Sequence, residues 1–360
     1  MKRNIFLTVA VVLLQGLCMQ VSAQTEKSQV PLADPYILLE GDTYYAYGTN
    51  DANGIRCYTS TDLKYWKYRG LALNKVNTTE TQWFWAPEVY HVGDKYIMYY
   101  SANEHLYAAT AKSPLGPFRQ VGSYQMEGLL GNEKCIDSSV FFDTDSTAYM
   151  FFVRFTDGNC IWQVQLSDDY ITPVEGTLKK CFSATEEWEL RMGKVVEGPN
   201  VYKQGMRYFL TYSGNDYRSQ DYAVGYAQTT NISRGSWPKS SSNPFLRRWK
   251  GLYGTGHHSL FTDKEGQLRI VFHAHDSQES VHPRSMYIGT VMCRATIMRM
   301  TQDAMVVPVL GTAPSPVSDV PEASGSSPLS YYTTDGVRHA VPVEGINLVS
   351  QGGKVRKVVK

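Results

Sequence analysis

The sequence lacks an excess of charge of either sign. Its 360 residues include 35 basic and 34 acidic side chains, which leaves a formal net charge of +1. No long block of one sign interrupts the chain, so the basic patch typical of a nucleic-acid-binding protein is missing. We therefore expect a neutral ligand and no nucleic-acid partner.

Cysteine is also scarce. The sequence has six cysteines, and five remain when the first 23 residues are set aside: Cys57, Cys135, Cys160, Cys181 and Cys293. This odd number leaves at least one thiol unpaired, and the spacing fits neither a disulfide framework nor a CxxC metal site. We do not expect the function to depend on cysteine chemistry.

Long apolar runs are missing as well. The start, MKRNIFLTVAVVLLQGLCMQVSAQT, combines two early cations, an apolar stretch and a small-x-small ending, which is typical of a cleaved signal peptide. A membrane anchor is the alternative, but the apolar run from Ile5 to Leu14 is shorter than the about 20 residues that span a bilayer, and no later stretch supplies them. A lipid anchor on Cys18 is disfavoured because the bulky Leu17 precedes it. We expect cleavage after Ala23, no membrane span, and an exported protein, periplasmic, cell-surface or extracellular.

Helical periodicity is nowhere sustained, and a repeated β pattern takes its place. Five segments about 50 to 60 residues apart each predict a strand, a tight turn and a second strand, and a third strand follows. The segments are DPYILLEGDTYYAYGT from Asp34, APEVYHVGDKYIMYYSA from Ala86, DSSVFFDTDSTAYMFFV from Asp137, GPNVYKQGMRYFLTYSG from Gly198 and HHSLFTDKEGQLRIVFHA from His257. Five such copies predict an all-β fold, a five-bladed β-propeller, because radial repetition leaves only short sheet edges. A β-sandwich is the alternative, but it has no reason to repeat one motif five times.

The composition changes toward the C-terminus. Residues 311–330 are rich in Pro, Ser, Gly and Ala, which is typical of a linker or extended segment. The sequence thus predicts a signal peptide over 1–23, one propeller domain over 31–310, this segment, and a short β tail over 331–360. The tail is either a sorting segment or a β appendage. We expect a monomer.

One position of the repeat carries polar and charged residues. Three residues before the apolar anchors Ile37, Val89, Val140, Val201 and Leu260 stand Asp34, Ala86, Asp137, Gly198 and His257, and Glu197 directly precedes Gly198. In a propeller the first strand of each blade lines the central channel, so these residues should meet at one mouth. Each of these acids, taken alone, can be explained as part of an ordinary turn sequence. Three converging acids, however, repel one another unless a function or a counter-charge holds them together.

The motifs around these acids resemble those of glycoside hydrolase family 43 over residues 31–310. They are LADPYI with Asp34, CIDSSVFF with Asp137 and VEGPNVY with Glu197, together with WAPEV (85–89) and GTGHHS (254–259). The resemblance implies a five-bladed propeller that hydrolyses glycosides with inversion. By motif, Asp34 would be the general base, Glu197 the general acid, and Asp137 the residue that raises the pKa of that acid and orients it. The chemistry agrees, since an inverting glycosidase needs one carboxylate to activate water and one protonated carboxyl to protonate the leaving oxygen.

The same resemblance assigns two further roles, and the aromatic residues at the same rim predict a third. His257 matches a pore histidine beside which an ion, often calcium, sits; the alternative is a hydrogen-bonded histidine without metal, since hard cations prefer oxygen ligands. Arg284 matches an arginine near the sugar, and its alternative is a surface cation. Trp85, with Trp83 further out, would form an aromatic platform for a sugar ring, and the alternative is ordinary core packing between blades.

The leading prediction is a secreted glycosidase that removes terminal α-L-arabinofuranosyl residues from plant polysaccharides, with an oligo- or polysaccharide as its partner and no organic cofactor. A β-xylosidase or xylanase and an exo-galactan hydrolase are alternatives of the same fold. A non-catalytic carbohydrate-binding propeller is an alternative of another class. Such a lectin needs aromatic side chains but has no use for a base, an acid and a third carboxylate in register.

Overall fold

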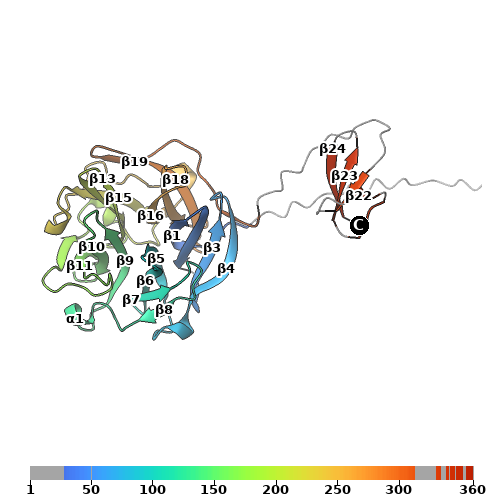
Figure 1. The fold of residues 1–360 in the computed structure, drawn as a ribbon. Helices are drawn as coiled ribbons and strands as arrows, with labels where there is room; N and C mark the ends of the chain where they lie inside the picture. The colour runs from blue at the N-terminus through green and yellow to red at the C-terminus, as the bar shows by residue number, and fades with distance from the viewer. Residues whose placement is uncertain are drawn as a thin grey trace, which may run out of the picture.

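The computed structural model describes residues 28–49, 51–312, 330–333, 338–339, 341–344, 346–351 and 354–359 (Figure 1). The predicted signal peptide and most of the predicted linker lie outside these residues. Within the described part, no helix is long and apolar enough to cross a membrane. The one α-helix found there is α1 (Glu127–Leu130), and strands form nearly all other regular structure, which confirms the all-β class.

Residues 33–300 form five sheets in chain order, and neighbouring strands within each of them pair antiparallel. The first contains β1 (Ala33–Glu40), β2 (Thr43–Thr49), β3 (Gly54–Ser60) and β4 (Tyr65–Asn74). The second contains β5 (Trp85–Val92), β6 (Lys95–Ala102), β7 (His105–Ala111) and β8 (Arg119–Val121). The third contains β9 (Cys135–Phe142), β10 (Ala148–Arg154), β11 (Cys160–Leu166) and β12 (Lys179–Phe182). The fourth contains β13 (Val196–Gln204), β14 (Arg207–Gly214) and β15 (Ala223–Thr229), and the fifth β16 (Gly256–Thr262), β17 (Leu268–Ala274), β18 (Ser285–Arg294) and β19 (Ile297–Met300).

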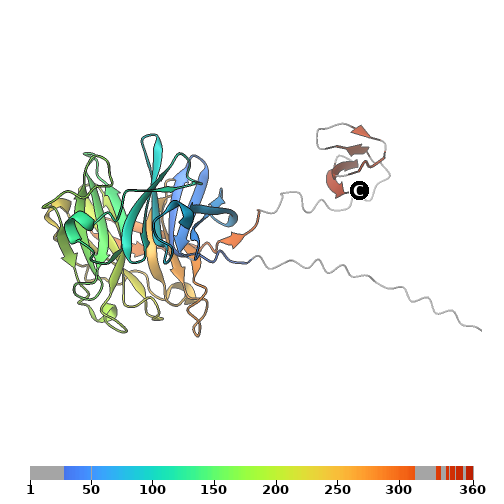
Figure 2. The same cartoon turned by 90° about the horizontal axis from the view of Figure 1, so that it is seen from below.

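Short 3-10 turns lie in the connections between these strands. They are η1 (Lys75–Asn77), η2 (Glu187–Glu189), η3 (Ile232–Arg234) and η4 (Trp249–Gly251). Each of the five repeated sequence segments forms the first two strands of one sheet, joined by a tight turn, as the repeat predicted. In the view turned by 90°, many of these strands lie roughly along one common axis (Figure 2).

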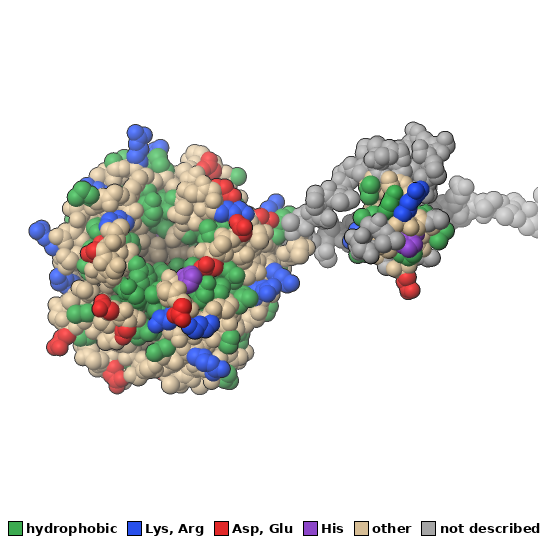
Figure 3. All heavy atoms as spheres, in the orientation of Figure 1, with side chains coloured by type: hydrophobic (Ala, Val, Ile, Leu, Met, Phe, Trp, Pro, Cys, Tyr) green, Lys and Arg blue, Asp and Glu red, His purple; other side chains and the backbone are tan. Residues whose placement is uncertain are grey.

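The five sheets follow one another in a closed circle. The first strand of each sheet contacts the first strand of the next, from β1 through β5, β9 and β13 to β16, and β16 contacts β1 again. Five clusters of buried apolar side chains fill the spaces between consecutive sheets, the fifth of them between the fifth sheet and the first. Burial of apolar side chains on both sides of each sheet is therefore the main stabilising contribution. The face seen in Figure 3 is hollowed near its middle, and hydrophobic side chains gather around the hollow.

The end of the chain adds two features. β20 (Val309–Leu310) runs parallel to β4 and extends the first sheet, so residues near the end of this part pair with its beginning. A further antiparallel sheet follows, with β22 (Arg338–His339), β21 (Ser330–Tyr332), β23 (Ile346–Gln351) and β24 (Lys354–Val359) in that order. The role of this terminal sheet, as a sorting segment or as a β appendage, stays a prediction.

Candidate active site

Five residues at one register position share a left-handed backbone. The residues are Asp34 (φ 48°), Ala86 (φ 43°), Asp137 (φ 59°), Gly198 (φ 54°) and His257 (φ 40°). The pairing of each first strand with the second shifts register at this residue, as in a β-bulge. The shift turns the residue out of the regular pleat and frees its N–H from the ladder. The sequence indicated the common position, and the bulge is its physical basis.

A side chain from a neighbouring sheet captures the freed N–H in four of the five copies. Ala86 N–H donates to Thr49 Oγ1 at 3.0 Å, Asp137 N–H to Ser101 Oγ at 2.9 Å, His257 N–H to Ser213 Oγ at 2.8 Å, and Asp34 N–H to His273 Nδ1 at 3.1 Å. The acceptors Thr49, Ser101, Ser213 and His273 occupy equivalent positions near the ends of the second strands. Each of these four bonds ties the first strand of one sheet to the second strand of the preceding sheet around the circle.

The fifth N–H, that of Gly198, is bound differently. The equivalent position in the third sheet is Val153, whose side chain has no acceptor. Gly198 N–H donates instead to Oδ2 of Asp137, at 3.2 Å. Asp137 therefore fills a structural position that an alcohol or imidazole fills elsewhere, and its carboxylate lies against the residue that follows Glu197.

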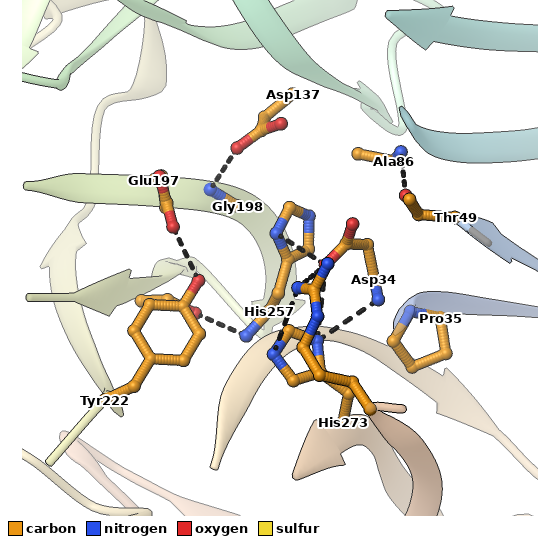
Figure 4. A network of polar contacts seen from close by, with 12 residues as sticks. Asp34, Pro35, Thr49, Ala86, Asp137, Glu197, Gly198, Tyr222, His257 and His273 are labelled. Carbon is orange, nitrogen blue, oxygen red and sulfur yellow. Dashed lines mark hydrogen bonds and ion pairs between the residues drawn. The ribbon is translucent and has the colours of Figure 1, made fainter. Parts of the chain in front are cut away.

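The three predicted acids come together at this end of the sheets. Asp34, Asp137 and Glu197 are only 7%, 5% and 8% exposed. Figure 4 shows them on three different sheets around a common space, with His257 and Tyr222 beside them. Asp34, Asp137 and His257 also line one cavity, together with Glu88 and Ser138. The residues that the sequence placed at one mouth thus lie at one site.

Asp34 lies against one guanidinium and two imidazoles. Arg284 Nη1 donates to its Oδ1 at 2.9 Å, and the Nδ1 atoms of His273 and His257 lie 3.2 and 3.4 Å from the same oxygen. Burial alone would raise the pKa of Asp34, but Arg284, His257 and His273 together hold it well below its usual range. Asp34 is therefore a carboxylate at neutral pH.

The pKa of Glu197 is shifted in the opposite direction from that of Asp34. Tyr222 donates its hydroxyl to Oε1 at 2.9 Å, and Asn159 Nδ2 donates to Oε2 at 3.0 Å. Burial raises the pKa of Glu197 to about 7, because the charges of Asp34 and Asp216 add to it while the two hydrogen bonds only partly oppose it. Glu197 therefore holds a proton over much of the acidic and neutral range.

Asp137 and Glu197 affect each other's protonation. Burial raises the pKa of Asp137 well above its usual range, and the neighbouring Glu197 and Asp34 carboxylates add to this effect. Two such carboxyls lose their protons in two steps that belong to the pair. At neutral pH the pair therefore retains a proton beside the ionised Asp34.

Two tryptophans lie at the beginning of the second sheet. The rings of Trp83 and Trp85 stack with centroids 5.7 Å apart and an interplanar angle of 13°. Trp83 is 46% exposed, whereas Phe84 between them is buried in the core. Phe84 thus packs between the sheets, and Trp83 and Trp85 form a stacked pair with one exposed ring, whose role as a sugar platform stays a prediction.

Comparison with known proteins agrees with this geometry. The family model for glycosyl hydrolases family 43 matches residues 28–305. The chain belongs to this family. It is a glycosidase, and the family resemblance deduced from its motifs is confirmed.

Several relatives of this family 43 glycosidase are known. The extracellular exo-alpha-(1->5)-L-arabinofuranosidase ArbA of Cellvibrio japonicus is 25% identical over 70% of this chain and 81% of the relative. The crystal structure of an endo-1,4-beta-xylanase from Bacteroides thetaiotaomicron is 41% identical, covers 80% of this chain and 99% of its own, and has a TM-score of 0.75. That of a thermostable family-43 glycoside hydrolase is 30% identical, covers 81% and 99%, and has a TM-score of 0.70.

A calcium ion beside His257 stays a prediction. The described residues contain no group of three or more His, Cys, Asp or Glu that could hold a metal ion. Burial lowers the pKa of His257, so its imidazole is neutral, but the Arg284 guanidinium is bound to the Asp34 carboxylate next to it. A hard cation prefers several oxygen ligands, and these side chains do not offer them. We derive no step through a metal.

Sequence reasoning missed Tyr222, Asn159 and His273. Tyr222 precedes β15 and Asn159 precedes β11, so they lie outside the repeat position that carries the acids. His273 is different, because it stands three residues after Ile270, just as Thr49, Ser101 and Ser213 stand three residues after the partners of their own anchors. Comparing the ends of the second strands would have found it. His258, the neighbour of His257, is 3% exposed, and its Nε2 contacts Thr211 Oγ1 at 2.7 Å.

Proposed function

We propose that this glycosidase hydrolyses arabinofuranosyl linkages by an inverting single displacement. Asp34 is the general base, Glu197 the general acid, and Asp137 the residue that orients Glu197. The observation that carries the proposal is the contrast between two buried carboxyls at one mouth. The pKa of Asp34 lies well below its usual range, whereas burial raises that of Glu197 to about 7. General acid–base catalysis needs this pair of protonation states at one pH.

The reaction assigns a task to each group. Asp34 takes a proton from water as the water oxygen bonds to the anomeric carbon, and Glu197 gives its proton to the leaving oxygen as the glycosidic bond breaks. Tyr222 and Asn159 hold one oxygen of Glu197 each, which fixes the carboxyl. Arg284 keeps Asp34 ionised and held in one orientation. Afterwards Glu197 carries the charge and Asp34 the proton, and exchange with solvent restores both.

The fold supports this assignment. We infer that the five sheets are the blades of a five-bladed propeller, because their first strands follow in a closed circle and five apolar clusters separate them. Export is proposed on the N-terminal sequence and on the names of relatives, several of which are called extracellular.

Two sugars are candidates. Arabinofuranosyl linkages are supported by the curated relatives, since ArbA is named an exo-alpha-(1->5)-L-arabinofuranosidase and a Bacillus subtilis relative an endo-alpha-(1->5)-L-arabinanase. β-Xylosidic linkages are the second candidate, because the solved structure that is 41% identical is described as a xylanase. The two candidates share the acids, so only the sugar subsite separates them.

A panel of nitrophenyl glycosides tests the proposal. The purified chain should hydrolyse the α-L-arabinofuranoside faster than the β-D-xyloside and the β-D-galactoside, and Asp34→Asn should lose activity on all of them. Proton NMR of the first sugar released from an oligosaccharide should show the inverted anomer. Preference for the xyloside selects the second candidate, a retained anomer rejects single displacement, and near-normal turnover by Asp34→Asn rejects Asp34 as the base.

A further inference from the structure

The loop after β10 connects the acid to an exposed aromatic ring. Residues 155–159, FTDGN, end in Asn159, whose side chain binds Glu197. The loop begins with Phe155, which is 40% exposed although residues 148–153 of β10 are buried. Asn159 is also fixed by its backbone, because its N–H donates to Lys194 O at 3.1 Å and its C=O accepts from Val196 N–H at 3.0 Å. The ring and the acid therefore belong to one anchored segment.

A groove lies beside this ring. Its lining consists of Phe155 and Thr156 from the loop, Glu133 and Lys134 from the segment before β9, and Glu104 from the turn between β6 and β7. Lys134 and Glu104 form an ion pair, and Arg154 holds Glu133 with two hydrogen bonds of 2.7 Å. The groove thus combines a flat apolar ring with fixed polar groups, which suits a sugar, since a sugar offers an apolar C–H face and a rim of hydroxyls.

Hydrogen bonds link the turn that carries Glu104 to the segment that carries the stacked tryptophans. Gln82 is next to Trp83. Its side-chain Nε2 donates a hydrogen bond to Asn103 Oδ1 at 3.0 Å, and its backbone carbonyl accepts one from Asn103 N–H at 3.2 Å. Asn103 and Glu104 form the turn between β6 and β7. The residues from Trp83 through Glu104 and Lys134 to Phe155 therefore form a connected arc from the second sheet to the third. The loop at the end of this arc also carries Asn159, which binds Glu197.

We propose that this arc is a binding subsite for the sugar units of the leaving group. The proposal rests on the function proposed above. A general acid must lie next to the leaving oxygen, so the chain that departs extends from the side of Glu197. Phe155 stacks against a leaving-group ring, and the ion-paired Glu104 and Lys134 bind its hydroxyls. The substrate class is accordingly an oligosaccharide or polymer, and a disaccharide leaves part of the arc unused.

Chain-length dependence of the kinetics tests this subsite. The probes are α-1,5-linked arabinobiose, arabinotriose and arabinotetraose, or the β-1,4-linked xylose series if the panel selects xylosides. In the native chain, kcat/KM should rise with chain length. Phe155→Ala should lower the ratio of kcat/KM for the tetraose to that for the nitrophenyl glycoside by about tenfold, and Phe155→Trp should retain the ratio. Met206→Ala is the matched control, because Met206 is 84% exposed in the turn between β13 and β14, at the opposite end of its strand from Glu197.

The outcomes separate this inference from the proposed function. An unchanged ratio in a Phe155→Ala protein that melts like the native chain would overturn the subsite. If the native chain hydrolysed no probe, the proposed function would fail, and native gels containing arabinan or xylan would decide the subsite. Retardation of the native chain but not of Phe155→Ala would support it, and equal migration would reject it.

Discussion

The backbone N–H of Gly198 donates a hydrogen bond to the carboxylate of Asp137, over a distance of 3.2 Å. This bond joins the third sheet to the fourth directly beside Glu197. Asp137 thus influences Glu197 in two ways, by fixing the backbone of the next residue and by its own protonation. The two effects are separable by experiment.

Asp137→Asn should shift the alkaline limb of the pH–rate profile to lower pH. The pKa of Glu197 is raised, and activity requires its protonated form, so activity is present below that pKa and lost as pH rises through it. The amide removes one carboxyl of the coupled pair, so Glu197 should lose its proton at lower pH, while the amide oxygen still accepts from Gly198. Measuring kcat/KM against pH checks the shift. An alkaline limb and a maximum rate that both stay in place would mean that Asp137 is only a structural residue of the bulge.

Glu197→Gln should distinguish substrates by their leaving groups. Natural glycosides need protonation of the leaving oxygen, so their turnover should fall by about 10²–10⁴-fold. Dinitrophenyl glycosides leave readily without a proton and should lose much less. The comparison requires the two substrates to carry the same sugar, and an equal loss on both would contradict the role of Glu197 as acid.

Arg284→Met should shift the acidic limb of the profile to higher pH. Arg284 is the largest influence that lowers the pKa of Asp34 against the effect of burial. Without it the pKa of Asp34 rises, and because the base acts as a carboxylate, activity should be lost at a higher pH on acidification. We expect about a tenfold loss of kcat/KM near pH 5. Arg119→Met is the control, since Arg119 on β8 is exposed and donates a hydrogen bond to Asn77 in the turn η1, not to Asp34. Identical acidic limbs in both variants would exclude this role for Arg284.

Gly256→Ala should lower both the stability of the fold and the catalytic activity of Glu197. A Cβ at Gly256 would lie 2.3 Å from Cε1 of Tyr222, whose ring is fully buried and whose hydroxyl binds Glu197. Displacement of this ring should destabilise the folded state by about 1–3 kcal/mol and lower the turnover of natural glycosides. Thermal denaturation and kinetics measure the two effects. Gly128→Ala, where the added Cβ meets no atom within 4 Å, should leave the melting temperature in place or raise it. A native-like Gly256→Ala would show that Tyr222 can move without consequence.

The features that recur in each copy of the repeat could be predicted from the sequence. The five turns, the alternation of the first two strands and the shared register of Asp34, Asp137 and His257 all recur in the chain, so one copy supports the interpretation of the next. Glu197 differed from this register because Gly198 takes the left-handed position, and a preceding residue presents its side chain to the same site. The fourth strands β4, β8, β12 and β19 were missed, since they are largely exposed or short and show little alternation. Contacts such as Asn159 to Glu197 depend on how separate sheets meet, which no local pattern specifies.

The five left-handed residues at positions 34, 86, 137, 198 and 257 have different requirements for stability and for catalysis. Four of these five residues are not glycine, and each holds a backbone conformation that costs a non-glycine residue about 1–3 kcal/mol. Glycine would relieve that strain at every position, yet glycine at 34 or 137 would remove a carboxylate. Selection for a more robust fold and selection for turnover therefore favour different residues at the same few sites. Variants that melt at higher temperature without losing activity should therefore carry their substitutions at other positions. The strain at these positions should remain, and the rest of the five-sheet fold must offset it.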